Sequence, residues 1–117
     1  MHVGIGQLVL RLRHCRSLKD KRSVVQGLVQ KLRNGGWSVV EWGTQDNLKL
    51  AQIGMVFAAP TAADLQERFY QVDRLLLGDF EVMSFDKEEL NAERSLAEAE
   101  EEELYDDDNL LDVRDPD

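Results

Sequence analysis

The residues best suited to chemistry are six basic side chains concentrated between positions 11 and 22. This basic cluster consists of Arg11, Arg13, Arg16, Lys19, Lys21 and Arg22. Ser17 is a typical helix N-cap, so the cluster surrounds a predicted loop and first helical turn. Cations beside the free amides of a helix N-terminus are typical of sites for phosphate or other anions. The alternative is a charged surface whose cations pair with neighbours such as Asp20.

The three cations that follow Ser17 oppose the helix dipole. Lys19, Lys21 and Arg22 each cost about a few tenths of a kcal/mol at a helix N-terminus. Since the sequence tolerates this cost, we interpret the basic cluster as a candidate RNA- or anion-binding site.

No other group of residues predicts catalysis, a cofactor or a metal site. His2 and His14 are too far apart in sequence to indicate shared metal ligands. Cys15 lacks an identifiable orienting acid, and a small buried cysteine is the alternative to a reactive thiol. Gly4-Ile5-Gly6 lies within a predicted strand and lacks a third glycine, so it indicates close backbone approach rather than nucleotide binding. We therefore expect a protein that is not an enzyme.

Hydrophobic periodicity predicts the elements that position the basic cluster. Leu8, Leu10 and Leu12 alternate with other residues in a strand predicted over 3–13. A helical apolar stripe predicts a helix over 18–34, which Gly35-Gly36 ends. The remaining predicted elements are strands over 37–43 and 51–59, a helix between Thr61 and Gly78, and a strand over 80–85.

The resulting β-α-β-β-α-β order predicts an α+β fold, a ferredoxin-like two-layer sandwich. Four antiparallel strands form one layer, and two helices cover one face of the sheet. We assign this domain to residues 1–88 and expect residues 89–117 to form an acidic, largely disordered tail, with a transient or docked helix over 88–104 left open.

Charge is distributed unevenly between these two parts. The chain has a net charge of −9, but residues 91–117 hold 12 acidic and 2 basic side chains. Residues 1–90 hold 11 acidic and 12 basic ones, so the domain is nearly neutral. No stretch approaches the roughly 18 apolar residues of a membrane helix, so we expect no membrane partner. The single Cys15 cannot form an intrachain disulfide, so we expect a cytoplasmic protein.

Trp37, Trp42 and Phe57 are large aromatic residues on predicted strands. Such residues stack on bases if they face away from the helices, but core or interface positions are the more common alternative. The first predicted strand has no aromatic residue, so the paired-aromatic platform of RNA-binding sheets is missing.

The run Ser17–Arg22, SLKDKR, resembles the YlxP-like family, a bacterial family of unknown function. Leu8–Leu12 is similar to the family's first strand and Leu28–Asn34 to its first helix, while Val40–Asp46 and Ile53-Gly54 match its central hairpin. The resemblance covers about residues 3–87 and implies a ferredoxin-like fold. Genes of the family in some bacteria lie beside those for transcription elongation and translation initiation factors, which implies a role near RNA or the ribosome.

Two functions remain open from the sequence. The leading hypothesis is a non-catalytic RNA- or ribosome-associated module whose basic cluster contacts phosphates, with the acidic tail competing for the same cations. The alternative is a protein-interaction module that forms a homodimer through the uncovered face of its sheet.

Overall fold

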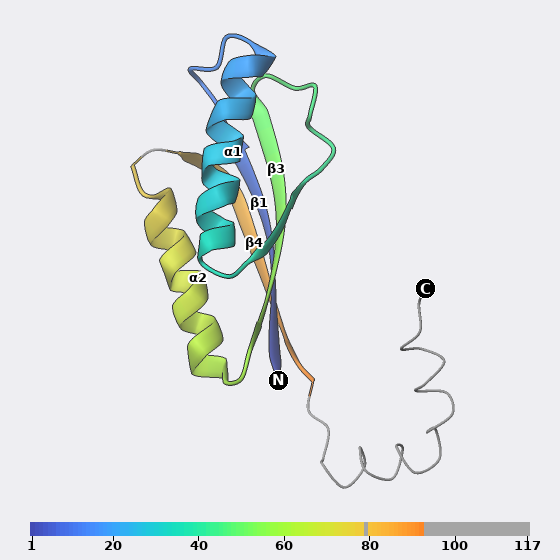
Figure 1. Ribbon diagram of the computed structural model, residues 1–117, viewed down its shortest axis with the longest axis vertical. Coiled ribbons are helices and arrows are strands. Elements are labelled where there is room, and N and C mark those ends of the chain that lie inside the picture. The colour runs from blue at the N-terminus through green and yellow to red at the C-terminus, as the bar shows by residue number, and fades with distance from the viewer. Residues whose placement is uncertain (79, 93–117) are drawn as a thin grey trace, which may run out of the picture.

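The computed structural model describes residues 1–78 and 80–92, which form one sheet and two helices (Figure 1). In chain order the elements are β1 (His2–Arg11), α1 (Leu18–Asn34), β2 (Ser38–Glu41), β3 (Leu50–Ala59), α2 (Ala62–Leu76) and β4 (Glu81–Asn91). The strands pair antiparallel in the order β2-β3-β1-β4. The predicted ferredoxin-like fold is confirmed.

Both helices begin where the sequence predicts, because a hydroxyl caps each one. The Ser17 side chain accepts a hydrogen bond from the Asp20 amide at 3.1 Å, and Thr61 does the same for Asp64 at 3.1 Å. Each capped amide would otherwise lack a partner in the first turn. The end of α1 at Asn34 is followed by Gly35 and then Gly36, whose φ of +94° suits a residue without a side chain.

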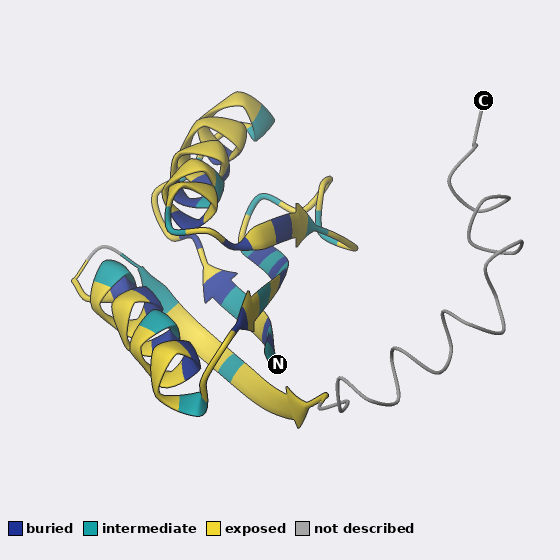
Figure 2. Cartoon of the chain, turned by 60° about the horizontal axis from the view of Figure 1, so that its bottom comes forward, coloured by how far each residue is buried: buried dark blue, intermediate teal, exposed yellow. Residues whose placement is uncertain are grey.

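The alternation along β1 divides the sheet into a core face and an open face. Leu8, Leu10 and Leu12 are buried beneath α1 and α2, while the odd-numbered side chains of β1 point the other way. Figure 2 shows both helices on the same side of the strands. We call the opposite side the open face; it carries the odd-numbered residues of β1 and the even-numbered residues of β2 and β3.

Gly4 and Gly6 lie on the core face, where they admit large side chains close to the backbone. A Cβ at Gly4 would lie 2.6 Å from Leu65 Cδ1 and 2.8 Å from Phe69 Cε2. A Cβ at Gly6 would lie 2.8 Å from Met55 Cγ. The prediction that this glycine pair allows close approach is therefore confirmed.

The strand β4 is longer than predicted. It continues past Phe85 to Asn91 because its main chain pairs with β1 along the whole length, with Glu89 opposite Gly4 and Asn91 opposite His2. Backbone pairing requires no apolar side chains, so an exposed acidic stretch still forms a strand (Figure 2).

This extension corrects the predicted domain boundary, because the boundary after residue 88 falls inside β4. For the helix over 88–104 that the sequence leaves open, residues 88–91 are instead a strand. The rest of the predicted tail, residues 93–117, lies outside the described residues.

The close approach at Gly4 predicts opposite effects for two alanine substitutions. We expect Gly4→Ala to lower the free energy of unfolding by about 1 to 3 kcal/mol, because the added methyl overpacks against Leu65 and Phe69. Gly27→Ala is the matched control: nothing lies within 4 Å of the added Cβ, so it should stabilise the protein by about 0.5 to 1 kcal/mol. Urea denaturation measures both, and equal effects would contradict the packing described here.

Candidate anion-binding site

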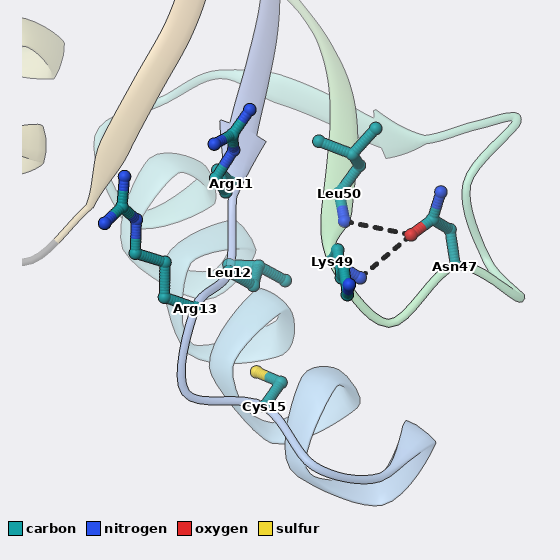
Figure 3. Close-up of a pocket in the computed structure, with 7 residues that line it drawn as sticks. All are labelled: Arg11, Leu12, Arg13, Cys15, Asn47, Lys49 and Leu50. Carbon is teal, nitrogen blue, oxygen red and sulfur yellow. Dashed lines mark hydrogen bonds between the residues drawn. The ribbon is translucent and has the colours of Figure 1, made fainter.

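The end of β1 and the start of β3 are held together by the segments that adjoin them. Leu12 follows β1 and is buried, and its amide donates to the Lys49 carbonyl at 2.7 Å. Asn47 folds the connection before β3, because its Oδ1 accepts from the amides of Lys49 at 2.8 Å and Leu50 at 3.2 Å (Figure 3). Together these bonds place the side chains of two separate segments around one hollow.

This basic hollow has a volume of about 600 Å³. It is lined by Arg11, Leu12, Arg13, Cys15, Asn47, Lys49 and Leu50 (Figure 3). The described lining residues thus include three cations and an amide but no carboxylate. Leucine side chains and the Cys15 thiol supply the apolar surface of the hollow. The hollow is therefore suited to an anion that is larger than a monatomic ion.

A neighbouring hollow of about 330 Å³ shares Arg11 and Arg13 but also includes Glu81. Both oxygens of Glu81 accept from Arg13, at 2.5 Å from Nε and 2.9 Å from Nη2. The hydrogen bond from Arg13 lowers the pKa of Glu81, and the same contact raises the pKa of Arg13. Arg13 therefore already has an anionic partner. Glu81 competes for Arg13 with any other anion that enters this smaller hollow.

The structure separates the six residues of the predicted basic cluster into three groups. Arg11 and Arg13 line the basic hollow. Arg16, Lys19 and Arg22 are exposed in the loop before α1 and in its first turns, outside the residues that line the hollow. Lys21 is buried and does not belong to the exposed surface.

Lys21 is therefore a correction to the predicted site. Only 2% of its surface is exposed, and its Nζ lies 3.1 Å from a Glu41 carboxylate oxygen. Nζ also donates to the Thr44 carbonyl, so two partners offset the loss of water around the ammonium. A signal was present in the sequence: Lys21 precedes Val25 by four residues and Leu28 by seven, which places it on the buried stripe of α1.

Lys49 and Asn47 were not predicted as site residues. Both lie in the connection to β3, which the sequence indicates only as a polar loop. Their place beside Arg11 follows from the β1–β3 register, where Arg11 pairs with Leu50. Antiparallel pairing of these two strands was the one available signal, because it brings the start of β3 to the end of β1.

The aromatic residues divide between the core and the open face. Trp37 is buried, and its ring lies 5.3 Å from that of Phe57 and 5.1 Å from that of Phe69. Arg68 covers Phe57 at 5.1 Å. Trp42 remains 46% exposed on the open face. Two of the three predicted aromatic residues thus follow the core alternative.

Within residues 1–78 and 80–92, no group of three or more His, Cys, Asp or Glu side chains is arranged to hold a metal ion. None of the helices described has the length and apolarity needed to span a bilayer.

A family model described as "Protein of unknown function (DUF503)" matches residues 3–88 of the chain. The chain belongs to the DUF503 family. This confirms the resemblance to an uncharacterised family over nearly the same residues, while the YlxP-like name remains a resemblance. A search of curated proteins found no match to this DUF503 chain.

The DUF503 chain is also similar to several solved structures, at low sequence identity and with low TM-scores. The de novo designed protein Foldit4 is 7% identical over 80% of this chain and 100% of its own, with a TM-score of 0.47. The C-terminal domain of the MgtC protein from Mycobacterium tuberculosis is 8% identical over 81% and 94%, with a TM-score of 0.40. The de novo designed protein LFR1 1 with ferredoxin fold is 9% identical over 82% and 93%, with a TM-score of 0.39. Since all three scores are below 0.5, the fold assignment depends on the strand order of the chain itself.

The burial of Lys21 predicts a large effect from removing its ammonium. We expect Lys21→Met to lower the free energy of unfolding by about 2 to 3 kcal/mol, because the Glu41 carboxylate and the Thr44 carbonyl lose their donor. The double variant Lys21→Met/Glu41→Gln should recover part of this loss, since it removes the unpaired charge. Chemical denaturation measures both, and a Lys21→Met protein as stable as the wild type would contradict the buried pair.

Proposed function

We propose that this DUF503 protein is a non-catalytic RNA-binding module that holds backbone phosphates at the basic hollow. The observation that carries the proposal is the convergence of Arg11, Arg13 and Lys49 on one hollow without a carboxylate among its described lining residues. The exposed Arg16, Lys19 and Arg22 extend the positive charge onto the start of α1. The gene neighbourhood implied by the YlxP-like resemblance supports the same partner.

The chemistry of these side chains suits phosphodiesters. A guanidinium presents several N–H donors in a plane and bonds two phosphate oxygens at once, whereas Lys49 acts as a point charge. Such contacts fix the position of a nucleic acid but do not read its sequence. Trp42 is the aromatic residue of the described open face, and it is only half-exposed. We therefore expect little base stacking and weak sequence preference.

Within this proposal, the acidic residues of 93–117 compete with RNA for the same cations. A shortened chain that tests the competition must retain residues up to Ala92. Truncation at Glu88 would instead remove the segment that pairs with His2–Gly4 and the bond from the Ala92 amide to the Met1 carbonyl.

The proposal predicts salt-dependent RNA binding that depends on the basic hollow. We expect Arg11→Ala and Lys49→Ala each to weaken binding and to lower the slope of log affinity against log salt by about one, since each removes a phosphate contact. Filter binding to a short single-stranded RNA at several salt concentrations measures both quantities. The matched control is Lys31→Ala, which removes the same charge from an exposed site in the last turn of α1. No binding by the wild type, or equal losses in all three variants, would overturn the proposal.

The Arg13–Glu81 pair predicts a gain of affinity from a neutral substitution. Glu81→Gln should strengthen RNA binding a few-fold at low salt, because it frees Arg13 from its carboxylate partner. Because the pKa of Glu81 lies below its ordinary value, the wild-type pair persists as pH falls through the usual carboxylate range and opens only at lower pH.

The control for Glu81→Gln is Glu67→Gln, which removes one negative charge from an exposed position on α2. The same gain in both variants would show that net charge alone is responsible and would contradict a role for Arg13.

A further inference from the structure

The open face carries a row of exposed apolar side chains that the RNA-binding proposal does not use. Trp42 is 46% exposed, Val40 57% and Val56 43%. On β1, the side chains of Val3, Ile5 and Val9 are partly exposed. Large aliphatic and aromatic groups gathered on one face of a small protein commonly mark an interaction surface.

The strand register joins these residues into one patch. Val40 pairs with Gly54, and Val56 pairs with both Ile5 and Ser38. A Cβ at Gly54 would lie 3.5 Å from Val40 Cγ1 and 3.6 Å from Trp42 Nε1, so both side chains lie beside this glycine. The apolar surface therefore continues across β2, β3 and β1. We call it the apolar patch: Val3, Ile5, Val9, Val40, Trp42 and Val56.

The charges of the open face lie around the apolar patch rather than within it. Asp86 and Glu88 lie on β4, opposite Gln7 and Ile5, and Arg11 lies at the far end of β1. Among the described residues of β2 and β3, no charged side chain points to the open face. The patch is thus uncharged, with a carboxylate border along one outer strand.

The strands that carry the patch have the size of a weak dimer interface. The ten-residue strands β1 and β3 and the four-residue β2, at about 3.3 Å per residue and about 4.8 Å apart, give a flat area on the order of 400 Å². Stable interfaces bury about 800 Å² per partner, measured over the more corrugated accessible surface, so a contact of this size forms only at higher protein concentration. Residues 1–92 hold 12 basic and 11 acidic side chains, so net charge does not keep two domains apart.

We infer that a second copy of this chain covers the apolar patch, so that the protein is a dimer packed sheet against sheet. With β3 lying over the partner's β3, β2 of each copy covers β1 of the other. The strands Glu81–Asn91 then lie outside, where Asp86 and Glu88 remain in water. Sheets packed in this way lie about 10 Å apart, a distance that the Trp42 and Val40 side chains fill. A basic partner would instead place its cations on Asp86 and Glu88.

Pairing through a sheet edge is less favourable than pairing through the open face. The β4 edge carries four consecutive charged residues, Asp86 to Glu89, and its register with β1 shifts between Val9 and Leu10. Charges and bulges of this kind oppose strand addition. The other edge, β2, is only four residues long.

Sedimentation equilibrium of the full chain tests the dimer. At about 150 mM salt, which screens the acidic residues, the mass should rise from one chain to two between low micromolar and about 100 µM protein. Val40→Lys should keep the protein monomeric over this range, because it places a charge in the centre of the patch. Val40 is 57% exposed, so the variant should fold, and circular dichroism checks that it does.

The matched control is Gln26→Lys, which adds the same charge to an exposed position on α1 and should dimerise like the wild type. A monomer at about 100 µM, or a dimer that Val40→Lys does not weaken, would overturn the inference.

Tryptophan quenching supplies a second readout. Trp42 is half-exposed and Trp37 is buried, so acrylamide quenching in one copy comes mainly from Trp42. Quenching should fall as protein concentration rises, and the concentration dependence should disappear in Trp42→Phe. Quenching that does not change across the dimerisation range would place the contact away from the open face and overturn the inference.

Discussion

The two-residue alternation of β1 is the constraint on which the rest of the structure depends. This strand lies between β3 and β4, so its pleat decides the face of every neighbouring side chain. Its even-numbered residues build the core under both helices, and its odd-numbered residues open onto the uncovered face. Arg11, the last residue of the strand, and Arg13, just beyond it, line the basic hollow. One periodic pattern thus positions the core, the apolar patch and the candidate site.

Lys21 links that sheet to the candidate site. Its ammonium connects the first turn of α1 to Glu41 at the end of β2 and to the Thr44 carbonyl in the following connection. The Thr44 hydroxyl in turn accepts a hydrogen bond from the Gln52 amide on β3 at 2.9 Å. Thr44 therefore joins this connection both to α1 and to β3. Asn47 and Lys49 lie in the same connection. A lysine that resembles a surface cation in the sequence therefore supports the loop that completes the basic hollow.

Local patterns were enough to predict the element order and both helix caps, because each depends on neighbours in sequence. The sequence also indicated close approach at Gly4-Ile5-Gly6, although the side chains that approach, such as Leu65 and Phe69, are distant in sequence. The site was predicted only in part. Arg11 and Arg13 line the hollow, but Lys49 joins them through pairing between distant strands, and Lys21 is buried by a loop that folds back over α1. The length of β4 was missed for another reason: main-chain pairing with β1 does not depend on apolar side chains.

The basic hollow and the apolar patch meet at Arg11, which belongs to the open face and lines the hollow. RNA that binds as proposed contacts the hollow and not the patch. Chemical-shift mapping of the ¹⁵N-labelled full chain, titrated with a short single-stranded RNA at low salt, distinguishes these two surfaces. We expect perturbed amides in residues 11–22 and 47–50. Perturbations confined to the strands around Val40 and Val56, or none at saturating RNA, would overturn the proposed RNA site.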